Sequence, residues 1–163
     1  MTYEDILKNL QETNLLVSRV LDGDSIVVIE INTHEEKEVR LYGLDAPETR
    51  KGRKLRVDEE KTRVAGDLLR FMGNQSKEFV KRVCPPGTLV TIYTEKGNET
   101  DFWGRQLAYV LLPDGSCLND LLITEGYAKA TSEYYCEQLS RYQVINWEAK
   151  LQKRGLYSIS ANF

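Results

Sequence analysis

The chain has 163 residues, of which 41% are hydrophobic and 29% charged, and its formal net charge is −3; these values are ordinary for one soluble globular domain. No apolar run approaches the roughly 18 residues that a membrane helix needs, and the first residues lack the basic start and apolar stretch of a secretory signal, so we expect a cytoplasmic protein with no membrane contact, or a secreted one if a signal has been removed. The negative charge also disfavours the broadly basic surface that commonly binds nucleic acid.

Short strands separated by turn residues are expected in the first 44 residues and again over 89–112. A polar lead-in with helical spacing over 3–13 precedes strand-like segments rich in Val, Ile and Leu. The first two flank an Asp-Gly turn and predict a hairpin. The five predicted strands cover 15–21, 25–31, 38–44, 89–94 and 107–112. Five short strands with helices appended predict an α+β fold with a mainly β core, a Greek-key barrel of the OB type.

Helical periodicity accounts for the remaining segments. The spacing predicts helices over 58–72 and 76–83, separated at Gly73-Asn74 and ended by Pro85-Pro86. A short helix is expected over 117–125, and a long amphipathic helix over 133–154, ended by a glycine. No repeat or linker interrupts the chain, so we expect residues 1–163 to form a single domain.

The cysteines and the histidine restrict the chemistry. Cys84, Cys117 and Cys136 are odd in number and lack C-x-x-C spacing, which favours buried free thiols over a disulfide or zinc role. The single histidine, His34, lies in a polar turn and cannot supply a pair of imidazole ligands, which zinc sites usually require. Any metal site must therefore be built from oxygen ligands.

Carboxylates gather in two neighbouring segments. Asp22 and Asp24 lie in the Asp-Gly turn, which alone would indicate only a hairpin. Asp45 and Glu48 follow the third strand, which we expect beside that hairpin, so pairing would bring residues 24 and 45 close together. Two such carboxylates repel by several kcal/mol at an effective dielectric of about 20. A divalent cation removes that repulsion, and oxygen ligands indicate calcium or magnesium.

Two arginines flank these carboxylates in the predicted fold. An arginine on a strand, such as Arg40, most often makes a surface salt bridge, but Arg40 lies five residues before Asp45. Arg105 follows the tight Trp103-Gly104 turn and would approach from the other side. Paired guanidiniums bind the oxygens of a phosphodiester. Carboxylates and arginines together predict a metal-assisted phosphodiesterase.

The segments Asp-Gly-Asp-Ser from Asp22, Val-Arg-Leu-Tyr-Gly-Leu-Asp-Ala-Pro-Glu from Val39, and Asp-Phe-Trp-Gly-Arg-Gln-Leu-Ala-Tyr from Asp101, in that order, resemble the staphylococcal nuclease family. A further element, Glu125-Gly-Tyr-Ala-Lys-Ala, is similar as well, and the resemblance covers about residues 15–157. It implies an OB-type barrel and a calcium-dependent nuclease. The enzyme would cut DNA and RNA, preferably single-stranded, by in-line attack of water, leaving 3′-phosphate ends.

The resemblance also implies roles for individual residues. Asp24, Asp45 and the Ala46 backbone carbonyl would bind calcium directly, with Asp22 in the outer shell. Arg40 and Arg105 would stabilise the five-coordinate phosphorus, and Glu48 would orient or deprotonate the attacking water. Ala46 replaces a threonine that is common in the family, and a carbonyl ligand survives that change.

Several features around the predicted site leave alternatives open. The segment 50–72 is longer than the family's loop and contains Arg50, Lys51, Arg53, Lys54 and Arg56; it is either a solvated insertion or a substrate-binding arm, with Arg50, Lys51 and Arg53 contacting phosphates. Trp103 is either a base-stacking platform or a partly buried anchor of its loop. Phe102 replaces a common lysine. Tyr134 and Tyr135 lie where the pattern departs from the family, and they are left out of the predicted site.

Two other functions compete with the enzyme. An OB-type module that binds single strands without cutting them would need the groove but not the catalytic groups, and an interaction scaffold would need neither. The acidic net charge favours the scaffold. The joint presence of Asp24, Arg40, Asp45, Glu48 and Arg105 favours the nuclease, which we expect to act as a monomer.

Overall fold

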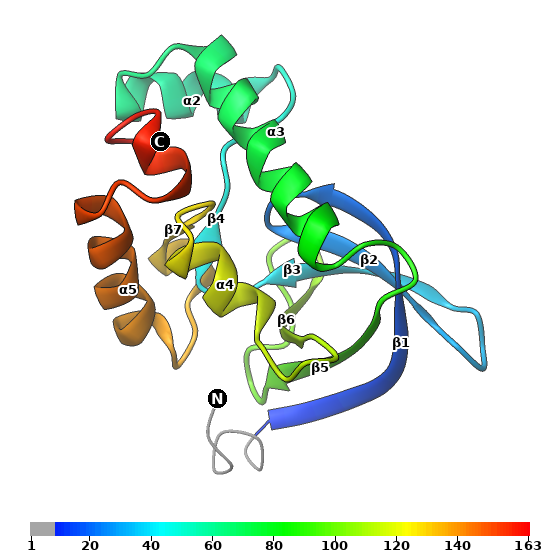
Figure 1. Ribbon diagram of the computed structural model, residues 1–163. Coiled ribbons are helices and arrows are strands. Elements are labelled where there is room, and N and C mark those ends of the chain that lie inside the picture. The colour runs from blue at the N-terminus through cyan, green and yellow to red at the C-terminus, as the bar shows by residue number, and fades with distance from the viewer. Residues whose placement is uncertain (1–8) are drawn as a thin grey trace.

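The computed structural model describes residues 9–163, in which five strands close into a barrel (Figure 1). The order around the barrel is β1-β2-β3-β6-β5, with β3 and β6 parallel and the other neighbours antiparallel. The strands are β1 (Asn9–Asp22), β2 (Ser25–Glu30), β3 (Glu36–Leu41), β5 (Leu89–Glu95) and β6 (Gln106–Leu111). This closed arrangement confirms the predicted OB-type α+β fold.

The barrel closes because β1 is long enough to pair on both sides. Its second half forms the predicted hairpin with β2, and β5 pairs with it from Asn9 to Leu16. Apolar residues of every strand fill the interior, among them the fully buried Ile26, Val39 and Ile92. Closure leaves no open sheet edge, so the barrel is a rigid platform.

Helices cover the barrel and extend beyond it. They are α2 (Arg53–Thr62), α3 (Gly66–Val83), α4 (Leu118–Thr124) and α5 (Leu139–Leu151), with 3₁₀ turns η1 (Ser132–Tyr134) and η2 (Gly155–Ser158). In Figure 1, α3 runs from the barrel towards α2, and the C-terminal segment lies between these two helices and α5. No helix within residues 9–163 is long and apolar enough for a membrane crossing.

A second apolar cluster holds the helical part together. It joins α2 and α3 to α5, η2 and the C-terminus through Leu55, Leu69, Met72, Ala149, Leu156, Tyr157 and Phe163. The segment 50–72 is therefore packed through α2 and the start of α3 rather than a freely solvated loop.

The predicted lead-in helix is wrong where the structure describes it. Residues 9–13 belong to β1, and Asn9–Glu12 pair with β5; residues 3–8 lie outside the described part. The polar spacing was misleading because this end of β1 is exposed on both faces, so polar residues are tolerated there without following a helical period.

The helix boundaries near Gly73 also differ from the prediction. α3 continues through Gly73-Asn74 to Val83, and the break lies earlier, at Arg63, whose φ is 60°. Glycine is required at 73 for another reason: a Cβ there would lie 2.4 Å from the Pro47 carbonyl oxygen. The helix therefore packs directly on the loop that carries Glu48.

The remaining helices and strands match their predicted ranges in part. The helix predicted over 117–125 is confirmed as α4, whereas α5 begins only at Leu139 because η1 and a turn occupy 132–138. The predicted strand 38–44 is divided at Tyr42-Gly43 into β3 and β4 (Leu44–Asp45), and β4 pairs with β7 (Lys129–Ala130). Gly43 makes this corner with a φ of 73°, and it lies tightly against Tyr142. The corner places Asp45 beside the β1–β2 turn.

Candidate active site

A cavity of about 470 Å³ lies where the β1–β2 turn, the end of β3 and the loop after β4 meet. Most of the predicted site residues line it, together with four that were not assigned to it. The lining residues are Asp22, Asp24, Glu38, Arg40, Ala46, Pro47, Glu48, Lys54, Trp103, Arg105 and Tyr134. Asp45 joins them through ion pairs with Arg40 and Lys54.

Arg40 is the fixed centre of the site, and only 2% of its surface is exposed. Its Nη1 donates to the carbonyl oxygens of Leu41 and Leu44, both at 2.9 Å. Its Nη2 lies 3.2 Å from Asp45 Oδ1 and 3.5 Å from Asp24 Oδ2. The guanidinium also stacks over the Tyr134 ring, 3.7 Å from the ring centre. Arg40 is not the surface salt bridge that a strand arginine commonly forms.

The two aspartates are held by different contacts. Asp24 Oδ2 accepts a hydrogen bond from the Ala46 backbone N–H at 3.0 Å, which ties the β1–β2 turn to the loop after β4. Asp45 Oδ1 accepts from Arg40 and, at 3.1 Å, from Lys54. Burial raises the pKa of Asp45, the Lys54 ammonium opposes this, and the Asp24 charge adds to it. The structure thus confirms that pairing brings residues 24 and 45 together.

Glu48 lies at the side of the cavity next to α2. Burial raises its pKa, and the Lys54 ammonium, 3.9 Å from Glu48 Oε2, works in the opposite direction. Asp22 lies close enough to add to the rise, and it accepts a hydrogen bond from the Thr49 hydroxyl at 2.7 Å. Glu48 therefore stands among charged groups at a half-buried position, where a water molecule can reach it.

Arg105 lines the same cavity, directly before the start of β6. Asp101 holds it, with Oδ2 accepting from Nε at 2.7 Å and Oδ1 accepting from its backbone N–H at 2.9 Å. Burial works against the charged guanidinium, but Asp101 raises the Arg105 pKa above its ordinary value. Arg105 Nη2 also donates to the Tyr134 hydroxyl at 3.2 Å. Tyr134 thus touches both arginines.

Tyr134 is a site residue that sequence reasoning missed. Its backbone carbonyl accepts from the Gly43 N–H at 2.7 Å, which fixes η1 against the corner before Asp45. No sequence signal marks it, because η1 reaches the site through the pairing of β7 with β4 and the contact with Gly43. Tyr135, in contrast, is exposed and does not line the cavity.

The aromatic residues at the rim are free to meet a ligand. Trp103 is 73% exposed, so it is not a buried anchor of its loop, and it lines the cavity. Phe102 packs edge-on against it with ring centres 5.4 Å apart, but it does not line the cavity.

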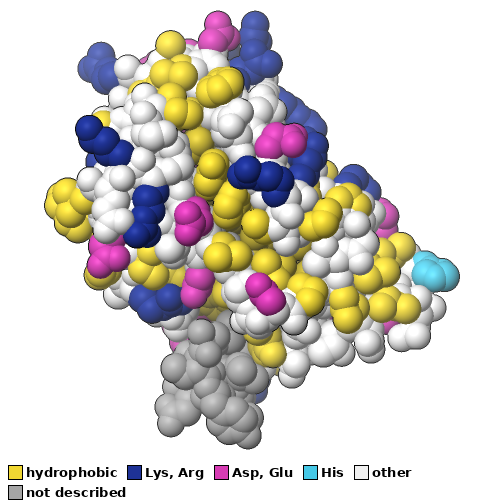
Figure 2. Space-filling view, viewed as in Figure 1, with side chains coloured by type: hydrophobic (Ala, Val, Ile, Leu, Met, Phe, Trp, Pro, Cys, Tyr) yellow, Lys and Arg dark blue, Asp and Glu magenta, His cyan; other side chains and the backbone are white. Residues whose placement is uncertain are grey.

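Of the basic residues in the segment 50–72, Lys54 lies inside the site, and Arg50, Lys51 and Arg53 lie outside it. Lys54 reaches Asp45 and Glu48. Arg50, Lys51 and Arg53 are exposed and, within residues 9–163, form no ion pair. In Figure 2, Lys and Arg side chains stand out at the end of the molecule where Figure 1 shows α2 and α3.

The oxygen atoms of the site suit a cation that keeps several water ligands better than one that is bound by protein ligands alone. Within residues 9–163, no group of three or more Asp, Glu, His or Cys side chains is arranged to hold a metal ion. Asp24 Oδ1 and Asp45 Oδ2 nevertheless accept no hydrogen bond from the described residues, which leaves one oxygen of each carboxylate for a ligand. Calcium accepts such a set when a carbonyl and water complete it.

The amino-acid sequence itself matches a known family of proteins. The sequence model described as "Staphylococcal nuclease homologue" matches residues 38–159, and the chain belongs to this staphylococcal nuclease family.

Several relatives in that family bear names that include an activity. An "uncharacterized endonuclease" of Escherichia coli O157:H7 is 29% identical over 142 residues, covering 87% of this chain and 75% of that protein. Endonuclease YhcR of Bacillus subtilis is 31% identical over 150 residues, which are 88% of this chain but only 11% of that protein. Endonuclease YncB of the same organism is 28% identical over 149 residues, 90% of this chain and 63% of the relative.

Proposed function

We propose that the protein is a nuclease that hydrolyses phosphodiester bonds of DNA and RNA with calcium, acts on single strands by preference, and leaves 3′-phosphate ends. The observation that carries the proposal is that Arg40 and Arg105, bridged by Tyr134, face the same cavity as Asp24 and Glu48. The family and the relatives named endonucleases support a nuclease. Calcium, the choice of polymer, the products and a monomeric state are proposals.

The arginines bind and stabilise the reacting phosphate. Arg40 is held by backbone carbonyls and Arg105 by Asp101, so both guanidiniums are positioned before substrate arrives. Fixed donors that meet growing negative charge lower the barrier without reorganising during the reaction. A planar guanidinium can donate two parallel hydrogen bonds to the nonbridging phosphate oxygens, which a lysine ammonium cannot do.

Glu48 is placed to orient or deprotonate the attacking water. It lines the same cavity as Arg105, with Lys54 and Asp22 as charged neighbours. A carboxylate whose pKa is raised is a better base than an ordinary one when it is ionised.

Asp24, Asp45 and the Ala46 carbonyl would hold calcium, with Asp22 acting through water. When bound, calcium supplies positive charge that polarises the phosphate. Asp22 already accepts a hydrogen bond from the Thr49 hydroxyl, which supports an indirect role for it.

Exposed residues at the edge of the cavity contact the nucleotides that neighbour the cleaved bond. A base that is not stacked in a duplex can lie on Trp103, which favours single strands. Arg50, Lys51 and Arg53 follow directly from the loop of Glu48 and are free of ion pairs within the described chain, so they can bind neighbouring phosphates.

The test is the release of acid-soluble nucleotides from single-stranded DNA and from RNA. We expect cleavage with calcium, much less with magnesium, because magnesium requires a near-ideal octahedron, and none with excess chelator. Asp24→Asn should weaken calcium binding measured by calorimetry, whereas Glu48→Gln should stop cleavage and largely spare calcium binding. Binding of single-stranded DNA without any product would instead identify a binding module. Cleavage that survives the chelator would refute the mechanism.

A further inference from the structure

Lys54 is a cation in the cavity to which the mechanism above gives no role. Its ammonium lies 3.1 Å from Asp45 Oδ1 and 3.9 Å from Glu48 Oε2. A lysine side chain is an ammonium at neutral pH. It therefore occupies the carboxylate cluster that the proposed function assigns to calcium.

Lys54 is held much less firmly than Arg40, the other cation on Asp45. The Arg40 side chain is 2% exposed and fixed by two carbonyl oxygens, whereas the Lys54 side chain is 46% exposed. Within the described residues, the only groups that Lys54 Nζ contacts are carboxylates. A four-carbon stem that ends in a point charge changes partners readily. Of the two cations, Lys54 is the one that can leave.

We propose that Lys54 is an exchangeable counter-ion: it holds Asp45 in the metal-free protein, and it moves to a substrate phosphate when calcium takes its place. The inference rests on the proposed function. Two cations on one carboxylate repel each other, so calcium and the ammonium compete for Asp45. The negative charge of a phosphodiester then offers the released ammonium a new partner.

The anchoring of α2 makes this exchange a side-chain motion. Leu55, the next residue, is buried in the second apolar cluster with Leu69 and Met72. The backbone at 54 therefore stays beside the cavity while the ammonium moves. Lys54 would bind phosphate only where the carboxylates already hold a metal, which couples substrate binding to metal occupancy.

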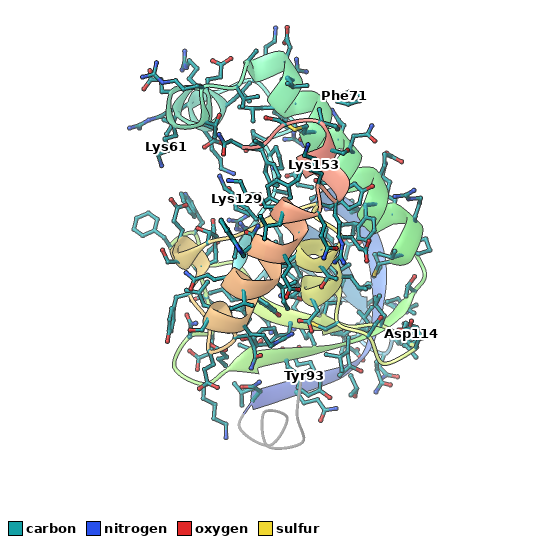
Figure 3. The ribbon with its side chains drawn as sticks, turned by 60° about the vertical axis from the view of Figure 1, so that its left-hand side comes forward. Lys61, Phe71, Tyr93, Asp114, Lys129 and Lys153 are labelled. Carbon is teal, nitrogen blue, oxygen red and sulfur yellow. The ribbon has the colours of Figure 1, made fainter. Side chains whose placement is uncertain are left out.

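The test measures calcium affinity by calorimetry without nucleic acid, using folded variants checked by circular dichroism. Lys54→Met should bind calcium roughly tenfold more tightly, or better, because a competing charge is removed. Lys54→Arg keeps that charge and should stay within roughly threefold of the wild type. The matched control is Lys61→Met on the same helix; Lys61 is exposed, is labelled in Figure 3, and does not line the cavity.

Two further measurements follow the ammonium itself. The NMR signals of the Lys54 side chain should shift when calcium is added to the wild type. In saturating calcium, Lys54→Met should flatten the slope of log affinity against log salt for single-stranded DNA by about 0.7, the value for one lost phosphate contact.

The outcomes distinguish a failure of this inference from a failure of the proposed nuclease function. A wild type that binds calcium, with Lys54→Met unchanged or weaker, overturns the exchange and leaves the nuclease proposal standing. An unchanged salt slope overturns the transfer to phosphate. A wild type that binds no calcium overturns the metal assignment, and the exchange with it.

Discussion

The contact between α3 and the loop of Glu48 gives a sharp prediction at Gly73. Replacing an exposed helical glycine with alanine ordinarily stabilises a protein by about 1 kcal/mol. Gly73 is buried instead, and a Cβ there would lie 2.4 Å from the Pro47 oxygen and 3.0 Å from the Glu48 oxygen. Both neighbours are backbone atoms, which cannot rotate away as a side chain would.

We therefore expect Gly73→Ala to destabilise the protein. Overpacking typically costs about 1–3 kcal/mol, and the gain in helix propensity offsets about 1 kcal/mol of it. A net loss of up to about 2 kcal/mol lowers Tm by up to roughly 8 °C for a chain of this size. The loop must also move by a fraction of an ångström or more, and small misplacements of catalytic groups can cost up to about 100-fold in rate.

The assay is urea unfolding followed by tryptophan fluorescence, together with kcat on single-stranded DNA in calcium. The control is the reverse change at an exposed position of the same helix, Gln75→Gly, which should lose about 1 kcal/mol of stability and keep its activity. A Gly73→Ala protein that is more stable than the wild type and fully active would refute the close approach of helix and loop.

Three further groups of substitutions test the site. Arg40→Lys and Arg105→Lys should each lower kcat by roughly two orders of magnitude, because the charge remains but the fork is lost; a smaller loss than tenfold contradicts their role. Trp103→Ala should weaken binding of single strands by roughly 1–3 kcal/mol at unchanged Tm, and Phe102→Ala, outside the cavity, should not. Replacing Arg50, Lys51 and Arg53 with serine should flatten the slope of log affinity against log salt by roughly 2. The same change should raise KM and leave kcat unchanged. An unaltered slope would mean that these residues form only a solvated surface.

The barrel was predictable because its signals are local. The hairpin of β1 and β2 was expected over 15–31 from an Asp-Gly turn between apolar runs, and the structure places it there. The register Ser25↔Arg40 then follows from antiparallel pairing, and it sets Asp24 beside the end of β3. That one register accounts for the positions of most carboxylates in the site.

The helix boundaries were less predictable because contacts distant in sequence decide them. Gly73 reads as a helix breaker when only its neighbours are considered, yet it is the residue that lets α3 approach Pro47. The β1 extension over 9–13 similarly depends on pairing with β5, about eighty residues further along the chain. Local propensity gives no information about such partners.

Tyr134 and Lys54 were missed as site residues for the same reason. A run of five basic residues gives no sign of which side chain turns inward; the burial of Leu55 against α3 decides it. Tyr134 reaches the arginines because η1 is bound to the corner at Gly43, which only the folded chain reveals. Both residues complete a site whose other members come from the β1–β2 turn, β3, the loop after β4 and the loop before β6.

The distribution of ion pairs answers the objection that an acidic chain binds nucleic acid poorly. Between residues 50 and 63, Lys54 pairs with site carboxylates. Within the described chain, the other cations of this stretch form no salt bridge; they are Arg50, Lys51, Arg53, Arg56, Lys61 and Arg63. At the same time Arg19, Lys37 and Arg141 elsewhere are neutralised by carboxylates. The unpaired positive charge of Arg50, Lys51 and Arg53 therefore lies on the segment that follows the loop of Glu48, and screening over about 10 Å makes local charge, rather than the net value of −3, decide what a nearby phosphate meets.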